Sequence, residues 1–286
     1  MQKFIYILLT VWLLNQSVHS QEILYSPAWF GPNANPVPET SNGEISTYST
    51  ISLSGNYYFG FGDQTRNLFV KTEVPLLAEK VSLSVWATLA ENYEVTPALA
   101  LQRNMKELKG KAKGDVYIQT KFLITGEKKY IPGINGRISL KTAAGNNVAN
   151  RRFFDTPGYF FDFEIYKYVY SDQEANFHVK TIMNLGFFSW ETNNSVQNDA
   201  PIYGLNVILI KNKIALENSL SGYYGWMSIK NPNYGDRPLV YTSKINYTNK
   251  KNKYFIQYQY GIKDFPYHHL SVGTALELDK LTPHYK

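Results

Sequence analysis

The chain has 286 residues, no cysteine, 23 tyrosines and a formal net charge of +6. Without disulfides, an exported chain of this size must be held together by a large core or by a closed ladder of backbone hydrogen bonds. The positive balance is modest and spread along the sequence, which argues against nucleic acid as a partner.

Residues 1–20 have the pattern of a secretory signal peptide. Basic Lys3 precedes an apolar run over residues 4–14, and small polar Ser17 and Ser20 follow. This apolar run is too short to span a bilayer as a helix. We therefore expect export and cleavage near Ser20.

Residues 21–46 form a proline-rich segment, which we call the lead. Its prolines at positions 27, 32, 36 and 38 are incompatible with a helix or a central strand. Trp29 and Phe30 nevertheless need cover from water. Two interpretations stay open: the lead packs on the periplasmic rim of the following domain, or it enters that domain as a plug or strap.

Residues 47–286 alternate with a period of two, which predicts about twelve β-strands. The alternation is clearest where Tyr254, Ile256 and Tyr258 interleave with Phe255 and Gln257. We assign the apolar set to the outside and the polar set to the inside. The segment 201–211 is apolar on both faces, so its phase is ambiguous.

The connections between the expected strands alternate in length. Those at one end are short or charged: 75–80, 126–133, 171–174, 211–213 and 248–253. Those at the other end are mostly longer: 91–114, 143–158, 191–201, 229–238 and 263–269, with 62–65 as the short exception. Short periplasmic turns and long extracellular loops are typical of a transmembrane antiparallel up-and-down β-barrel.

One long connection carries a helix signal. Thr96 fits an N-cap, Pro97 fits the first helical position, and Leu101, Met105 and Leu108 share one helical stripe. A short helix at the mouth of the barrel is one interpretation, and an irregular loop is the other.

The signal peptide, the alternation and the loop asymmetry resemble bacterial outer-membrane β-barrels over residues 47–279. The aromatic- and Asn-rich style of residues 26–39 is similar to that of Bacteroidetes outer-membrane proteins. The resemblance implies an all-β fold in the bacterial outer membrane, with lipid around it. The chain departs from many such barrels because residues 279–286 follow the last strand instead of a terminal aromatic residue. A soluble secreted β-protein is the alternative.

The inward faces collect twelve charged or titratable residues. They are Lys71, Glu73, Lys121, Arg137, Lys141, Asp162, Glu164, His178, Lys180, Glu217, Lys244 and Glu277. We expect pairing across strands, with Asp162 and Glu164 between the basic residues of both neighbouring strands, because unpaired charges in a narrow interior are costly. The set is either a structural ion-pair network or a lining that selects a solute.

The sequence supports catalytic, recognition and metal sites less well. His269 and Ser271 have a His-x-Ser spacing that resembles that of outer-membrane phospholipases. However, the assigned inward and outward faces place both residues inside the barrel, whereas those enzymes have their site on the lipid-facing side. Residues 151–155 and 231–237 mix Arg with aromatic residues, as recognition surfaces do. No spacing predicts a metal site or a cofactor.

The leading hypothesis is a narrow porin-like channel for small polar solutes. The alternatives are a plugged barrel that serves as an accessory subunit with an envelope protein partner, and an outer-membrane lipid hydrolase.

Overall fold

The computed structural model describes residues 29–77, 79–153, 156–192, 196–226 and 235–283. The predicted signal peptide lies outside these residues. Among the described residues, no helix is long and apolar enough to cross a bilayer.

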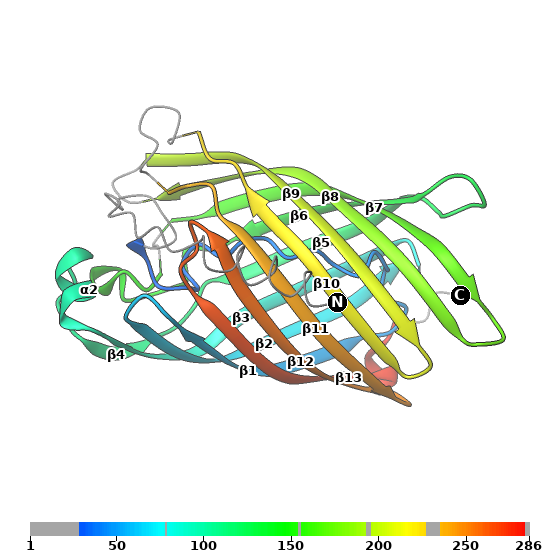
Figure 1. Cartoon of the computed structure of the whole chain (residues 1–286), viewed down its shortest axis with the longest axis horizontal. Coiled ribbons are helices and arrows are strands. Elements are labelled where there is room, and N and C mark those ends of the chain that lie inside the picture. Colours follow the sequence, from blue (N-terminus) through cyan, green and yellow to red (C-terminus); the bar gives the residue numbers. More distant parts are fainter. Residues whose placement is uncertain (1–28, 78, 154–155, 193–195, 227–234, 284–286) are drawn as a thin grey trace, which may run out of the picture.

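The chain forms a closed antiparallel β-barrel (Figure 1). The first half of the sheet contains β1 (Thr50–Phe59), β2 (Asp63–Leu77), β3 (Val81–Val95), β4 (Lys109–Ala112), β5 (Val116–Thr125), β6 (Gly133–Lys141) and β7 (Gly158–Asp172). The second half contains β8 (Phe177–Thr192), β9 (Val196–Lys211), β10 (Ile214–Tyr223), β11 (Leu239–Asn249), β12 (Asn252–Lys263) and β13 (His268–Glu277).

Twelve of these thirteen strands make the ring, and each pairs with its neighbour in sequence order. The ring closes where β13 pairs with β1, with Leu53 opposite Thr274. Strand β4 lies outside the ring and extends the sheet beside the far part of β3. The prediction of about twelve strands in an up-and-down barrel is confirmed.

The two ends of the barrel differ, and we name them by their connections. The loop end carries the long connections and the helix α2 (Pro97–Gln102), and the turn end carries the tight turns (Figure 1). Strand β1 begins and β13 finishes at the turn end. There the Ser49 hydroxyl donates to the carbonyl of Leu281, which ties the two ends of the sheet together.

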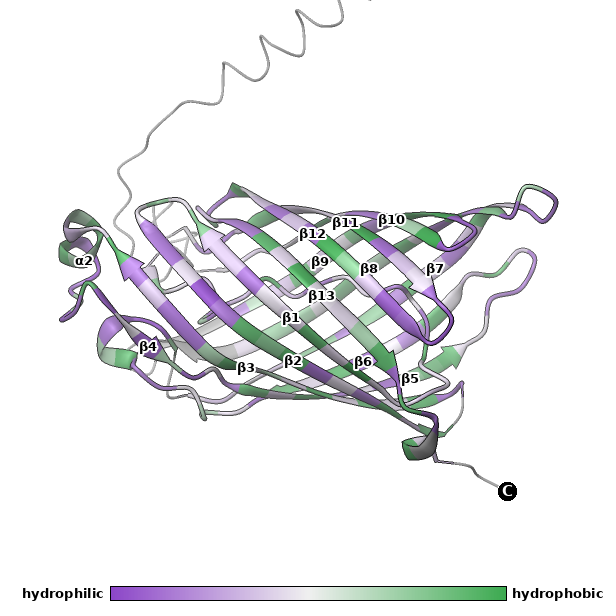
Figure 2. Cartoon of the chain, turned by 90° about the horizontal axis from the view of Figure 1, so that it is seen from below, coloured by the Kyte–Doolittle hydropathy of each residue, from purple (hydrophilic) through white to green (hydrophobic). Residues whose placement is uncertain are grey.

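Side chains alternate between the outside and the lumen, so hydrophobic and hydrophilic segments alternate along the strands in Figure 2. In β12, Tyr254, Ile256 and Tyr258 are exposed, whereas Gln257 and Gln259 are buried. In β9, whose phase the sequence left ambiguous, Ile202 and Ile208 are buried and Leu205 is exposed. The even-numbered residues of this strand therefore face the lumen.

The outer surface has the layering of a bilayer-facing barrel. A central zone of exposed aliphatic residues includes Leu205, Ile245, Ile256 and Val272. Exposed aromatic residues border it toward the loop end (Tyr159, Tyr203, Tyr224, Trp226, Tyr258 and Tyr260) and toward the turn end (Tyr170, Tyr247 and Tyr254). Two aromatic girdles around an apolar band match the two interfaces of a membrane.

Two sequence predictions need correction at the loop end. Strands β2 and β3 extend well beyond the apolar band, so residues assigned to the connections 62–65 and 91–114 belong partly to strands. The helix α2 is only six residues long, so Met105 and Leu108 lie outside it. It stops because Asn104 adopts a left-handed backbone with φ of 52°.

We expect a charge on the outer face of β12 to be much more costly than one on its inner face. Ile256→Lys places an ammonium group in the apolar band and should cost about 2–4 kcal/mol of folding free energy in lipid. Gln259→Lys on the same strand faces the lumen and should cost far less. Denaturant unfolding of both variants in liposomes measures the difference, and equal costs would contradict the assigned phase.

Candidate functional site: the lumen and the lead

The described part of the lead lies inside the barrel, against the inward faces of β5 to β9 (Figure 1). We call these faces the anchoring wall. Side chains of this wall hold the lead by hydrogen bonds. Both Nη atoms of Arg137 donate to the carbonyl of Glu39 (3.2 Å), Lys121 Nζ donates to Ser41 Oγ (2.8 Å), and Asn135 Nδ2 donates to the carbonyl of Gly43 (2.9 Å). Proline-rich backbone inside a barrel thus finds donors that no β-ladder supplies.

The anchoring wall is built on a buried cluster of ion pairs. Arg137 Nη2 lies 2.8 Å from Asp162 Oδ2, and Arg137 Nη1 lies 3.1 Å from Glu164 Oε1. Lys121 Nζ lies 2.6 Å from Glu164 Oε2. Lys121 and Arg137 are directly opposite each other in register. The two carboxylates therefore offset a like-charge contact that would otherwise be unfavourable.

Asp162 and Glu164 pair with fewer basic residues than the sequence predicted. Lys141 pairs instead with Asp115 at 2.9 Å, and Lys180 pairs with Glu44 of the lead at 3.0 Å. The cause is register, because Glu164 lies opposite Asn184 on β8 rather than opposite Lys180.

Two predicted lumen residues lie near the turn end. His178 Nδ1 is 2.6 Å from the Ser171 hydroxyl, next to the rim. Glu277 is opposite Thr50 at the end of β13. Neither is among the residues that line the cavity described next.

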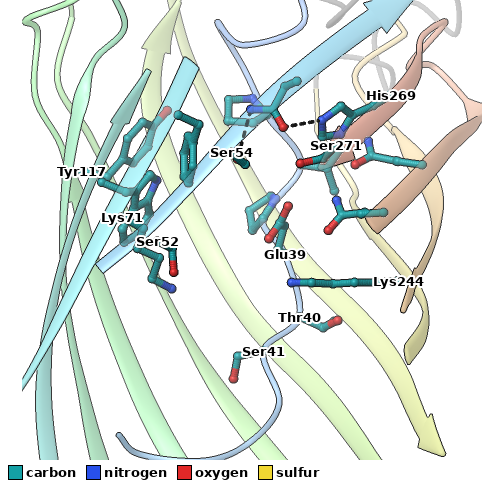
Figure 3. Close-up of a pocket in the computed structure, with 18 of the residues that line it drawn as sticks. Glu39, Thr40, Ser41, Ser52, Ser54, Lys71, Tyr117, Lys244, His269 and Ser271 are labelled. Carbon is teal, nitrogen blue, oxygen red and sulfur yellow. Dashed lines mark hydrogen bonds between the residues drawn. The ribbon is translucent and has the colours of Figure 1, made fainter. Parts of the chain in front are cut away.

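Beside the lead, the lumen keeps a cavity of about 410 Å³ (Figure 3). It borders the lead and the inward faces of β1 to β3 and β10 to β13, and residues of β5 to β7 line it as well. Predicted lumen residues Lys71, Glu73, Glu217 and Lys244 line it. Figure 3 shows Lys71 and Lys244 on opposite sides of the lead, with Glu39 between them.

The charges around the cavity balance. Five cationic residues line it, namely Lys71, Lys121, Arg137, Lys244 and Lys253. Five acidic residues line it as well, namely Glu39, Glu44, Glu73, Asp115 and Glu217. The cavity therefore presents no net charge to a solute, although charged groups of both signs are within reach.

A row of uncharged polar side chains completes the lining. Gln257, Ser271 and Asn56 are successive neighbours in register across β12, β13 and β1. Sequence reasoning placed them inside, but it named only charged or titratable residues as lumen-lining candidates and gave Ser271 only as a catalytic candidate. It also missed Lys253, which continues the inward phase of Phe255, and the two acidic residues of the lead, which no periodic pattern signals.

His269 and Ser271 point into this cavity and not toward lipid (Figure 3). The imidazole stacks on Tyr58 with 4.0 Å between ring centroids, and its Nε2 lies 3.1 Å from Asn56 Oδ1. Within the described residues, no His, Asp and Glu side chains gather as a metal site. The immediate partners of His269 are thus an aromatic ring and an amide, and both lie with it on the lumen side of the barrel rather than at the lipid-facing surface.

At the loop end, four buried charged residues form a second cluster, which we call the latch: Asp63, Glu91, Arg103 and Arg152. Asp63 Oδ2 lies 2.7 Å from Arg103 Nη1 and 2.9 Å from Arg152 Nη1. Arg152 Nε lies 2.6 Å from Glu91 Oε1. All four side chains are at most 1% exposed. The Arg152 side chain is therefore buried inside the protein. The hypothesis that residues 151–155 form a recognition surface does not hold for this residue.

The latch also holds the start of the lead. Asn33 Nδ2 donates to Glu91 Oε2 at 2.5 Å, and the Tyr267 hydroxyl donates to the carbonyl of Phe30 at 2.6 Å. The same Tyr267 hydroxyl accepts from Arg103. The second recognition segment, residues 231–237, lies mostly outside the described residues.

The latch lies beyond the apolar band, because the outward residues of β2 at this level are Gln64 and Arg66. Burial alone would raise the pKa of Asp63, but the guanidinium groups of Arg152 and Arg103 outweigh it and hold the pKa of this carboxyl below its usual range.

No family model and no curated protein matches the chain. Solved structures match in fold. The COG4313 outer membrane channel from Pseudomonas putida F1 gives a TM-score of 0.56 at 10% identity, over 84% of this chain and 100% of that chain. The transport unit of the autotransporter AIDA-I from Escherichia coli gives 0.51 at 8% identity, over 91% and 99%. This chain has the fold of a bacterial outer-membrane β-barrel. The KdgM porin gives a TM-score of 0.48 at 10% identity, over 79% and 99%.

We predict that Glu91→Gln destabilises the barrel by about 3 kcal/mol. Removing one partner of a buried ion pair leaves uncompensated charge, although Asp63 still neutralises part of Arg152. Glu94→Gln is the matched control, because Glu94 is exposed on the opposite face of the same strand. Its cost should stay below about 0.5 kcal/mol. Urea unfolding in detergent micelles measures both, and equal effects would show that the latch contributes nothing.

The latch should also make stability depend on acid. A carboxyl whose folded pKa is depressed contributes its full stability above its unfolded pKa, about 3.9, and loses it as the pH falls through the lower folded pKa. We therefore expect no contribution of Asp63 to the pH dependence between pH 8 and about 5, and a loss below about 4. In Asp63→Asn this acid-dependent part should disappear. If the variant lost as much stability below about pH 4 as the unmodified protein, the stabilising role of the Asp63 carboxylate would be contradicted.

Proposed function

We propose that this barrel is a channel in the bacterial outer membrane for small polar solutes, narrowed by its own lead. The observation that carries the proposal is the polar cavity that remains beside the lead within a closed ring. A ring of twelve strands is wider than the eight that side chains fill and narrower than a general porin.

The location rests on two observations and on one expectation from the sequence. The outer surface has an apolar band between two aromatic girdles. The structures of similar fold include the COG4313 outer membrane channel. The expected signal peptide at residues 1–20, cleaved near Ser20, supplies the export route. The aromatic- and Asn-rich composition supports an origin among the Bacteroidetes.

The balanced lining favours neutral or zwitterionic solutes over strongly charged ones. Charged rings of one sign select ions in channels, whereas this cavity combines five positive and five negative groups with a row of amides and a hydroxyl. Such groups replace the hydration of a polar solute without attracting one sign of charge. We therefore expect weak discrimination between cations and anions.

A second candidate is a closed barrel with an accessory role in an envelope complex. The buried latch favours it, because packed charged and aromatic side chains seal the lead at the loop end. Lipid hydrolysis is less well supported, since His269 and Ser271 face the lumen. Conductance distinguishes the channel from the closed barrel.

A disulfide between the lead and the anchoring wall tests whether the lead controls passage. A Cβ atom on Gly204 would lie only 2.4 Å from Thr40 Cγ2, so the pair Thr40→Cys and Gly204→Cys is within disulfide range. The chain has no cysteine of its own to interfere. In planar bilayers, we expect few or no conductance steps for the oxidised protein and frequent steps after reduction. Thr40→Cys alone should not respond to the reductant.

Removal of residues 29–44 is the complementary test. The ion pairs of Arg137 and Lys121 with Asp162 and Glu164 do not involve the lead, so these four residues stay neutralised without it, although Lys180 loses its partner Glu44. We expect stable steps larger than those of the full chain. Silence in this variant, with the folded state verified by its resistance to detergent, would overturn the channel and favour the accessory role.

A further inference from the structure

The lead has a direction within the lumen, and that direction is opposite to the one expected for a segment on the periplasmic rim. Its first described residues lie among the connections of the loop end. The Gly31 amide donates to the carbonyl of Arg151 at 2.7 Å, and the Tyr267 hydroxyl donates to the carbonyl of Phe30. Arg151 belongs to the β6–β7 connection, and Tyr267 immediately precedes β13.

The middle of the lead passes through the body of the barrel. Val37 packs into the apolar cluster that includes Tyr117 and Phe160. Thr40 lies against Gly204 of β9. Figure 3 shows Glu39, Thr40 and Ser41 in succession along the lead within the lumen.

The last part of the lead reaches the turn end. Glu44 pairs with Lys180, and the Ser49 amide, just before β1, donates to the Thr282 hydroxyl. The chain then reverses and returns toward the loop end as β1. The 18 residues from Trp29 to Ser46 reach about 60 Å when extended, which exceeds the roughly 30 Å of a bilayer core.

We infer that the lead crosses the whole lumen and that the N-terminal end of the processed chain is exposed at the extracellular face. The inference rests on the proposed outer-membrane location, in which the long loops face outward. A closed ring offers no lateral exit between strands, so whatever precedes Trp29 leaves the barrel at the loop end.

The same geometry determines how the lead would leave the lumen. The lead is covalently continuous with β1 at the turn end and is held by noncovalent contacts at the loop end. Its free end therefore leaves the latch first, and the segment swings about its periplasmic tether.

Single cysteines in this cysteine-free chain test the topology. We would produce Ser26→Cys, Leu101→Cys and Lys250→Cys in a Gram-negative host and apply a membrane-impermeant maleimide to intact and to permeabilised cells. Leu101 is 84% exposed on α2, and Lys250 is exposed in the β11–β12 turn. We expect Ser26→Cys to label in intact cells as Leu101→Cys does, and Lys250→Cys to label only after permeabilisation.

Labelling of Ser26→Cys only after permeabilisation would overturn the inference while leaving the outer-membrane location intact. If Leu101→Cys also required permeabilisation, the proposed location itself would fail. An epitope tag inserted between Gln21 and Glu22 gives a second readout that does not depend on cysteine reactivity. Antibody binding to the tag on intact cells supports the inference, and binding only after permeabilisation refutes it.

Discussion

The constraint on which this molecule depends is the need to pair every backbone amide and carbonyl where no water is available. In a bilayer, an open sheet edge would leave such groups without partners, and only a closed ladder removes the edge. Here closure is achieved when β13 pairs with β1 over ten residue pairs. The alternation of side chains follows from that closure, because each strand must present one face to lipid and the other to the lumen. The ring thus creates an interior that the chain has to fill or use.

The interior is divided unevenly. Along the anchoring wall, Arg137 and Lys121 are neutralised by Asp162 and Glu164, and their remaining donors are directed at the lead. Along the opposite side, polar side chains of β12, β13 and β1 face free volume. From Glu39 to Gly43, the lead is thereby held by side chains of the anchoring wall, whereas its start is held at the latch. The sequence left open whether the inward charged residues form a structural ion-pair network or a lining for a solute. In the structure, one part of this set forms ion pairs on the anchoring wall, and another part lines the cavity.

The sequence was sufficient to predict the barrel and the inward and outward faces of the strands other than β9, because those features come from local alternation and from loop lengths. The exposed set in β12 and the inward His269 follow directly from the period of two. Register could not be predicted, because it depends on bulges and strand ends. Lys141 and Lys180 therefore have partners other than Asp162 and Glu164. The path of the lead could not be predicted either, since proline-rich segments have no period and the donors that hold Glu39 and Gly43 come from distant strands.

The covalent link between the lead and β1 has a consequence for how firmly the lumen is occupied. The lead cannot diffuse away, so it meets the anchoring wall at an effective concentration set by its short tether, in the millimolar range for flexible linkers. Even contacts that would be weak between separate molecules then keep the lead in place most of the time. A modest change in the latch would alter the fraction of time that the barrel is vacated, rather than releasing a blocker into solution. If the barrel is the channel proposed above, it carries an inhibitor whose local concentration does not depend on the amount of protein in the membrane.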